Sequence, residues 1–211
     1  MKITKFGHCC LVIVEQGLKI LTDPGNYTSS QNKVTGVGLV LITHEHQDHL
    51  HIESLRAVLA SNPTAKIFTN HKVGEILRSE GINYELLEDG QQAMVGGVTI
   101  EGRGSKHAFI YSTLAEVVNV GYLINSKFFY PGDAFTIPGK PVEILALPVA
   151  APWLKISEAL DYAKQINPQV CFPVHDGALK IFGAAHMLPA KELATVGIKF
   201  IIPEPGVAFD I

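Results

Sequence analysis

The stretch of sequence that decides the fold is VGLVLITHEHQDH, residues 37–49. Its first seven residues form an apolar run that predicts a buried strand. Its last six hold four side chains able to bind a metal ion: His44, His46, Asp48 and His49. His44 and His46 are two apart and can point the same way on an extended chain, whereas Asp48 and His49 can face a second point where the chain turns. Since one tetrahedral ion rarely takes four ligands from so short a loop, the stretch predicts two ions that share it.

Four further apolar runs also lead to a histidine or an aspartate. The runs are residues 18–22, 98–101, 127–130 and 169–174, and the side chains that follow them are Asp23, His107, Asp133 and His175. In open α/β sheets, ligands bind in the crevice beyond the carboxyl ends of the strands. We therefore expect five segments of this chain to converge on one rim.

Composition sets the class of protein. The chain has 211 residues, 47% of them hydrophobic and 18% charged, which allows one sizeable core and predicts a single domain over residues 1–211. The net charge of −3 gives no basic surface for nucleic acid. The longest weakly polar stretch, 144–154, is shorter than the roughly 20 residues of a membrane helix, so no membrane association is expected. Three cysteines, two of them adjacent, make a poor disulfide framework, and we expect a cytoplasmic protein.

The order of the apolar runs predicts two sheets packed together with helices outside. Strands are expected at 2–6, 10–15, 18–22, 37–43 and 65–69, within 84–125, and at 127–130, 143–148, 169–174, 198–202 and 207–210. Helices are expected at 50–60, 73–79, 156–166 and near 189–195. Several of the strands are apolar at consecutive positions, which is typical of strands covered on both faces.

These motifs resemble the metallo-β-lactamase superfamily. Residues 44–49 match its His-x-His-x-Asp-His signature in full. Other matches are similar to one branch, the ascorbate-6-phosphate lactonase-like group of metal-dependent hydrolases, and they are Gly7-His8, Thr22-Asp23-Pro24, Tyr130-Pro131-Gly132-Asp133 and Pro173-Val174-His175. The resemblance spans nearly the whole chain. It implies the α/β class and a four-layer αββα sandwich with a dinuclear site at one edge.

The resemblance also implies a ligand set. The first metal ion would be held by His44, His46 and His107. The second would be held by Asp48, His49 and His175, and Asp133 would bridge both ions. Asp23 would orient a ligand histidine, as carboxylates beside metal-bound imidazoles usually do.

The chemistry of these side chains points to hydrolysis. Imidazole and carboxylate without thiolate suit Zn²⁺ best, with Mn²⁺ or Fe as alternatives. Two such ions about 3.5–4 Å apart activate a bridging water and polarise the scissile oxygen. Their four positive charges exceed the three negative charges of Asp48, Asp133 and a hydroxide, which favours an anionic or strongly polarised oxygen substrate. We expect a hydrolase of a small phosphoester, phosphodiester, lactone or related ester, with Asp48 and Asp133 as its catalytic carboxylates.

Three further side chains are candidates for the pocket wall. His8 follows the first strand, Trp153 lies in the loop after strand 143–148, and His186 lies in the same rim segment as His175. Each has a structural alternative, as a hydrogen-bonded histidine or a packed aromatic residue. The cysteines, Cys9 among them, are expected in the core.

Other functions stay open at this stage. A metal-binding regulatory protein without turnover would keep the ligands and lose hydrolysis. A nuclease is disfavoured by the mild acidity of the chain. A di-iron oxidoreductase of the same fold resembles His-x-Glu-x-Asp at the signature, whereas position 46 here is histidine. The sequence leaves the substrate and the oligomeric state undetermined.

Overall fold

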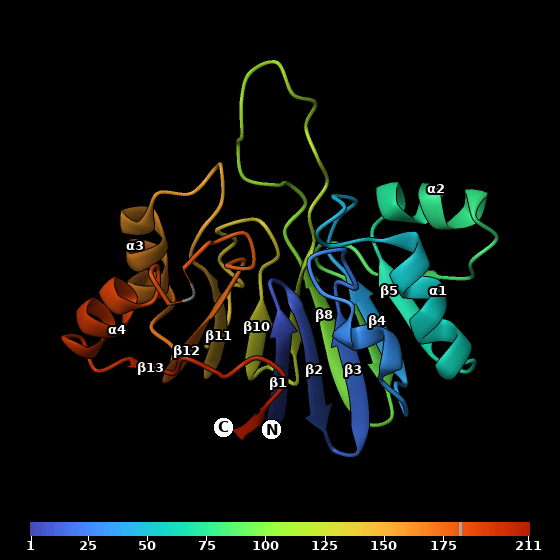
Figure 1. Cartoon of the computed structure of the whole chain (residues 1–211), viewed down its shortest axis with the longest axis horizontal. Helices are drawn as coiled ribbons and strands as arrows, with labels where there is room; N and C mark the ends of the chain where they lie inside the picture. The colour runs from blue at the N-terminus through green and yellow to red at the C-terminus, as the bar shows by residue number, and fades with distance from the viewer. Residues whose placement is uncertain (182) are drawn as a thin grey trace.

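The computed structural model describes residues 1–181 and 183–211, and within them the strands form two seven-stranded sheets (Figure 1). The first sheet has the order β14 (Ala208–Asp210), β1 (Lys2–Gly7), β2 (Cys10–Glu15), β3 (Leu18–Thr22), β4 (Leu39–Ile42), β5 (Lys66–Thr69), β6 (Glu85–Leu86). The second has the order β13 (Lys199–Phe200), β12 (Val170–Val174), β11 (Ile144–Pro148), β10 (Phe128–Tyr130), β9 (Gly121–Ile124), β8 (Val98–Arg103), β7 (Gln92–Val95).

Helices cover the outer faces of both sheets. The helices α1 (Ile52–Ser61) and α2 (His71–Ser79) pack on the first sheet, whereas α3 (Ile156–Ile166) and α4 (Met187–Ala194) pack on the second (Figure 1). A short 3₁₀ helix, η1 (Ser30–Lys33), precedes β4. The layers are helix, sheet, sheet and helix, which confirms the predicted αββα sandwich.

Strand β4 shows why the central strands are apolar at every position. Successive side chains of a strand point to opposite faces. Leu39 and Leu41 therefore enter the core between the two sheets, while Val40 and Ile42 pack under α1 and α2. All four are fully buried. A polar residue at any of these positions would face one of two cores, so the run stays apolar until the strand ends.

The two sheets share one pattern of connections. Strands β1, β2 and β3 form an antiparallel meander, with a tight turn at Gln16-Gly17 where both residues have positive φ. From β3 to β6 the pairing is parallel, as it is from β10 to β13. The last strand, β14, returns to pair with β1, and the Met1 amino group donates to the Ile211 carbonyl at 3.0 Å. Along the sequence, the strands of the second sheet therefore lie between β6 and β14, which both belong to the first sheet.

Some helices and strands begin or end at residues other than those predicted. The helix expected from residue 50 begins at Ile52, because a turn that follows β4 still occupies residues 47–49. The strand expected over 198–202 spans only Lys199–Phe200, ahead of Pro203, which has no N–H for a sheet ladder. Residues 104–120 form no strand and project as a long loop between β8 and β9 (Figure 1). Across the described residues, no helix is long and apolar enough to cross a membrane.

Candidate metal centre

The turn after β4 delivers four candidate ligands to one place. The backbone N–H groups of His49 and Leu50 both donate to the His46 carbonyl, at 2.9 and 2.7 Å, so the chain folds back on itself. The loop after β3 packs against this turn without space for a side chain. A Cβ on Gly25 would lie 1.8 Å from the Asp48 carbonyl oxygen. Glycine at this position therefore allows the two loops to touch.

Three histidines form the first cluster. The Nε2 atom of His44 lies 3.0 Å from the Nδ1 atom of His46, and one ring nitrogen of His107 completes a group whose atoms all lie within 4.8 Å of one another. A tetrahedral zinc ion with nitrogen ligands at its usual distance separates those nitrogens by roughly 3.3 Å. The three nitrogens are therefore spaced to hold one ion between them.

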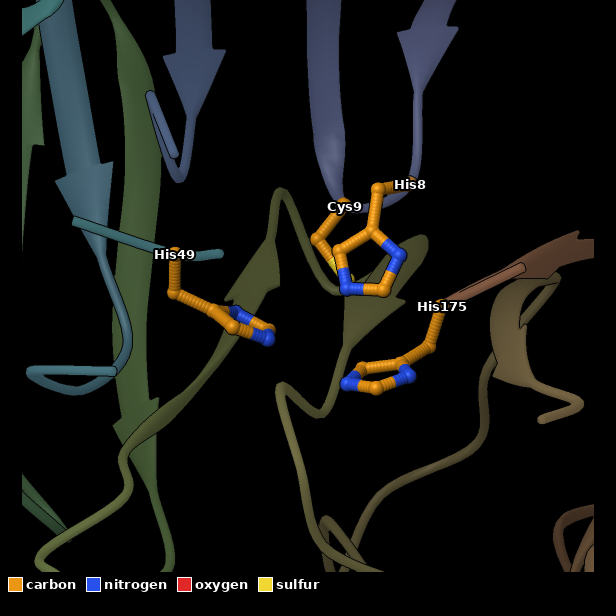
Figure 2. A group of neighbouring side chains, drawn as sticks. All are labelled: His8, Cys9, His49 and His175. Atoms are coloured by element: carbon orange, nitrogen blue, oxygen red, sulfur yellow. The ribbon is translucent and has the colours of Figure 1, made fainter. Parts of the chain in front are cut away.

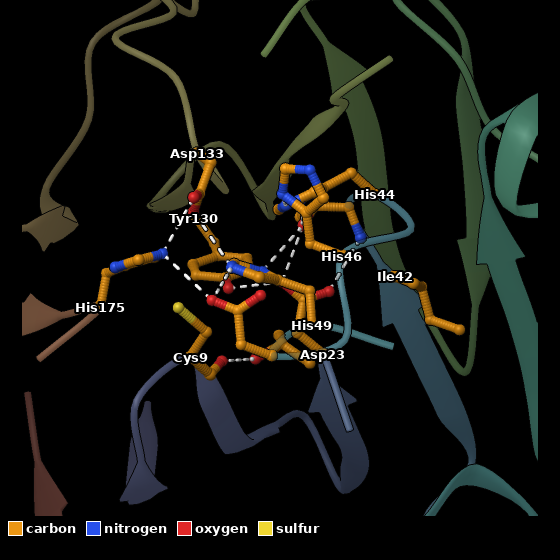
Figure 3. Close-up of polar contacts among 12 residues, drawn as sticks. Cys9, Asp23, Ile42, His44, His46, His49, Tyr130, Asp133 and His175 are labelled. Atoms are coloured by element: carbon orange, nitrogen blue, oxygen red, sulfur yellow. Dashed lines mark hydrogen bonds and ion pairs between the residues drawn. The ribbon is translucent and has the colours of Figure 1, made fainter. Parts of the chain in front are cut away.

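A second cluster lies beside the first. The Oδ2 atom of Asp48 is 3.8 Å from His49 Nε2 and 3.5 Å from His175 Nε2. Asp133 lies between the two clusters (Figure 3). Its Oδ1 is 3.1 Å from His49 Nε2, and its Oδ2 is 2.9 Å from His175 Nε2 and 3.4 Å from His107 Nε2. A carboxylate in this position can bind an ion on each side, as the resemblance implies for Asp133.

Hydrogen bonds on the far side of the imidazoles fix which nitrogen faces the centre. The Nδ1 atoms and their oxygen partners are His44 with Thr43 Oγ1 at 3.0 Å, His49 with Asp23 Oδ2 at 2.7 Å, His107 with the Ala108 carbonyl at 2.6 Å, and His175 with the Ala150 carbonyl at 2.6 Å. An Nδ1 that donates a proton leaves Nε2 as the lone-pair nitrogen. Each of these rings is thus oriented as metal-binding histidines usually are.

The centre also contains buried polar atoms that lack a hydrogen bond. They are His49 Nε2, His107 Nε2 and Asp133 Oδ1, taken over the described part of the chain. Buried polar atoms almost always have a partner. All three belong to the two clusters, so divalent ions bound there would supply the partners that these atoms lack. The residues present therefore fit the metal ions that the fold implies.

Asp23 accepts hydrogen bonds from the residues that orient the candidate ligands. It is fully buried, and it accepts the Thr43 amide at 2.8 Å, the Thr43 hydroxyl at 2.8 Å, His49 Nδ1 at 2.7 Å and the Tyr130 hydroxyl at 2.5 Å. Because the Thr43 hydroxyl donates to Asp23, its oxygen is left to accept from His44. One carboxylate thus orients ligands of both clusters. Neither Thr43 nor Tyr130 was expected to contribute a side chain to the site, although Tyr130 lies in a motif that the sequence indicated.

Charge at the centre is suited to cations. Burial alone would raise the pKa of Asp133, but His49, His107 and His175 hold it well below its usual value. The pKa of Asp48 is lowered in the same way, against burial, by the neighbouring His175 and His8 imidazoles. Both carboxylates are therefore anionic, and together they provide two negative charges where two cations would bind.

His8 contacts this centre directly. Its Nδ1 accepts the Gly177 N–H at 3.1 Å, so the ring proton is on Nε2, which donates to Asp48 Oδ2 at 2.9 Å. The ring also lies 4.1 Å from that of His175 between centroids (Figure 2). His8 therefore joins Asp48 of one ligand segment to the loop that follows His175, and it lines the cavity above them.

Cys9 lies in the core between the two sheets, as expected. Its sulfur also belongs to a group with His8, His49 and His175 whose candidate ligand atoms lie within 4.8 Å of one another, a contact that the sequence did not indicate (Figure 2). Burial would raise the pKa of the thiol, but the three imidazoles lower it to about 6. Cys9 reaches this position because the chain turns sharply at Gly7-His8, where both φ values are positive. The Gly-His pair that ends β1 is the only sequence signal of this turn.

The two remaining pocket candidates, Trp153 and His186, lie in different places. Trp153 lines a cavity of about 400 Å³ over the two clusters, and its Nε1 donates to Asp133 Oδ2 at 2.9 Å. His186 is not among the described residues that line this cavity. It is buried behind the rim, where its Nε2 lies 2.7 Å from Asp176 Oδ2, and Asp176 in turn pairs with the buried Lys5 at 2.6 Å.

Comparison with known proteins identifies the family of this chain. The family described as "Beta-lactamase superfamily domain" matches residues 2–175. The chain belongs to the metallo-β-lactamase superfamily. A member from Methanospirillum hungatei, named UPF0173 metal-dependent hydrolase, is 37% identical over 235 aligned positions that cover all of this chain and 99% of the relative. Protein Rv0786c of Mycobacterium tuberculosis is 33% identical over 180 residues, 83% of this chain and 84% of the relative.

A solved structure shares the metallo-β-lactamase fold over the whole chain. Igni18, a novel metallo hydrolase from Ignicoccus hospitalis, superposes with a TM-score of 0.75 at 23% identity and covers 100% of this chain and 98% of its own. Several relatives, among them the one from Methanospirillum hungatei, are named UPF0173 metal-dependent hydrolases. The chain is accordingly a metal-dependent hydrolase of the metallo-β-lactamase superfamily.

Proposed function

We propose that this hydrolase binds two divalent ions and cleaves a small ester, lactone, phosphoester or phosphodiester. The observation that carries the proposal is the position of Asp133. One carboxylate oxygen faces His49 at 3.1 Å, and the other faces both His175 at 2.9 Å and His107 at 3.4 Å. A site for a single ion would not need a buried carboxylate that reaches nitrogens of two separate clusters.

The chain's own residues hold and orient the ligands. When bound, two such ions would act as Lewis acids and lower the pKa of a water between them. Asp133 contributes the negative charge at the junction of the clusters, and Trp153 fixes the rotamer of that carboxylate through its Nε1 hydrogen bond. His8 fixes Asp48 in the same way. These contacts keep the carboxylates in place before substrate arrives, which is how a preorganised site lowers a reaction barrier.

Zinc is the metal that we propose first. Imidazole and carboxylate ligands accept Zn²⁺, Mn²⁺ or Fe. The Cys9 sulfur beside His49 and His175 adds a soft donor within reach of the second cluster, and soft donors favour zinc over manganese. We also propose that the partner of the site is a small molecule and not a nucleic acid, and that the enzyme is cytoplasmic.

The test combines metal loading with a substrate screen. Protein loaded separately with Zn²⁺, Mn²⁺ or Fe²⁺ is assayed on carboxylic esters, lactones, phosphomonoesters and phosphodiesters, with the metal content measured in parallel. The proposal expects turnover of at least one class by protein that holds two ions per chain. Protein with two bound ions and no turnover on any class would instead support the regulatory alternative.

A further inference from the structure

The cavity over the metal centre has a polar floor and an apolar wall. The floor consists of His8 and of five candidate ligands, which are His46, Asp48, His107, Asp133 and His175. The wall comes from four segments, and its members include Tyr27, Ile110, residues 150–153 and Leu179. The part of a substrate that does not react must lie against this wall, so the wall determines which substituents the site accepts.

Lysine and arginine are absent from the lining of this cavity, as far as the described residues go. The nearby lysines Lys106 and Lys155 are 75% and 80% exposed, and each lies 3.8 Å from a glutamate of its own segment. A phosphate or carboxylate held away from the metals would need such a cation, or a cluster of N–H donors.

The wall also has few hydrogen-bonding side chains. Among its described residues, the only polar side-chain groups are the Tyr27 hydroxyl and the Trp153 indole N–H. The indole N–H is already used by Asp133 at 2.9 Å. A substrate substituent thus meets aliphatic and aromatic carbon with at most one free phenol. Such a surface selects for apolar groups, since polar groups would lose their water without compensation.

The projecting loop between β8 and β9 extends the apolar surface. A second cavity, of about 330 Å³, runs along residues 106–117 of this loop and shares His107 and Ile110 with the cavity over the metals. Phe109 and Leu114 line it, and they are 76% and 56% exposed. The ion pair between Lys106 and Glu116 lines it as well, so its surface is apolar only in part. His107, near the start of the loop, is a candidate metal ligand that lines both cavities, so an apolar chain that leaves the centre past Ile110 reaches the side of the second cavity formed by Phe109 and Leu114.

Resting on the proposed hydrolase function, we propose that the substrate is an uncharged carboxylic ester or lactone with an apolar acyl or alkyl chain. Water adds to the carbonyl carbon, and the C–O bond to the alcohol oxygen breaks with its electron pair going to that oxygen. The alcohol oxygen takes up one proton, and the second proton of the water leaves as the acid ionises. The products are an alcohol and a carboxylate, joined in one molecule when the substrate is a lactone.

A homologous series of substrates tests the proposal. Metal-loaded enzyme is assayed on 4-nitrophenyl acetate, butanoate, hexanoate and octanoate, and on 4-nitrophenyl phosphate and bis(4-nitrophenyl) phosphate. A buried methylene contributes about 0.8 kcal/mol, so each added methylene that enters the cavity should raise kcat/KM about four-fold. We expect a rise through hexanoate and little turnover of either phosphate.

Variants locate the effect in the wall. Leu179→Ser should flatten the dependence on chain length and lower kcat/KM for hexanoate by about ten-fold, the effect of losing slightly fewer than about two buried methylenes, while acetate changes little. Leu188→Ser is the matched control, because Leu188 is exposed on α4 and lies outside the lining of both cavities. An equal loss in both variants would contradict a role for the wall.

Binding gives a readout that does not need turnover. Trp153 is the only tryptophan of the chain and lines the cavity, so its fluorescence reports occupancy. Titration with octanoate below its micelle concentration should give tighter binding than acetate or inorganic phosphate, and Leu179→Ser should weaken octanoate alone.

The outcomes separate this inference from the proposed function. Hydrolysis of phosphodiesters without dependence on chain length would keep the hydrolase and overturn the apolar substrate. No turnover by protein with both ions bound would overturn the hydrolase, and the order of affinities for octanoate and phosphate would still decide the ligand class. Tighter binding of phosphate than of octanoate would refute the inference in either case.

Discussion

Asp133→Asn is the substitution that most directly separates the roles of charge and shape at the centre. The amide has nearly the same size as the carboxylate, so the fold should survive. Trp153 Nε1 donates to Oδ2, and the amide must therefore keep its oxygen at that position. Its NH₂ group then replaces Oδ1, the atom that faces His49 Nε2 at 3.1 Å. An NH₂ group has no lone pair for a metal ion, so the second cluster loses a ligand and one negative charge.

The size of the effect follows from that geometry. Loss of one ligand should weaken the ion at the second cluster by at least the 10–100-fold that even outer contacts of a metal site contribute, as a rough lower bound. Turnover should fall on the order of 10²-fold or more, because activation and positioning of the attacking water fail together. The assay is steady-state hydrolysis of the best substrate from the screen, with metal content measured on the same sample.

The control removes the same charge elsewhere. Asp161 is exposed on α3, and Asp161→Asn should leave both rate and metal content unchanged. Wild-type activity in Asp133→Asn with two ions bound would refute the bridging role. Loss of activity with unchanged metal content would assign Asp133 to catalysis without a role in binding the second ion.

Three further predictions concern stability and metal affinity. Chelation should abolish activity and leave the far-UV circular dichroism largely intact, because the sandwich core is far larger than that of a zinc finger; complete loss of the signal would contradict this. Asp176→Asn strands the Lys5 ammonium, and since both side chains are at most 3% exposed, urea unfolding should show a loss of about 3–5 kcal/mol. The matched control for Asp176→Asn is Glu85→Gln, which breaks a pair exposed by more than half and should cost less than about 1 kcal/mol. His8→Ala removes the N–H that holds Asp48, and metal titration should show a roughly 10–100-fold weaker ion, with an unchanged titration arguing against this positioning role.

Local patterns were enough for the fold and for the principal candidate ligands. The run through Ile42 is apolar at every position, which a strand between two cores requires, and the polar residues begin where the strand ends. The same logic applies to the ends of β10 and β12, which lead to Asp133 and His175. His107 is brought to the first cluster as well, although its flanking residues carry a weaker pattern.

What the sequence could not supply depends on contacts between distant segments. Lysine is almost always exposed, so nothing in the pattern of β1 indicates that Lys5 is buried against Asp176, 171 residues away. Thr43 looks like the end of an apolar run, and only its contact with Asp23 shows that it orients His44. Cys9 faces the centre because of a backbone turn, not because of its neighbours in a periodic pattern. The apolar wall has the same origin, since it combines four segments that are far apart along the chain.

The number of metal ions per chain tests the central claim most directly. Native mass spectrometry of protein saturated with Zn²⁺ counts bound ions on the folded chain without any substrate. If Asp133 joins two clusters, the wild-type protein should carry two ions, and Asp133→Asn should retain only one at low metal concentration. A wild-type protein that holds a single ion at saturation would contradict the dinuclear centre and the hydrolytic mechanism proposed from it.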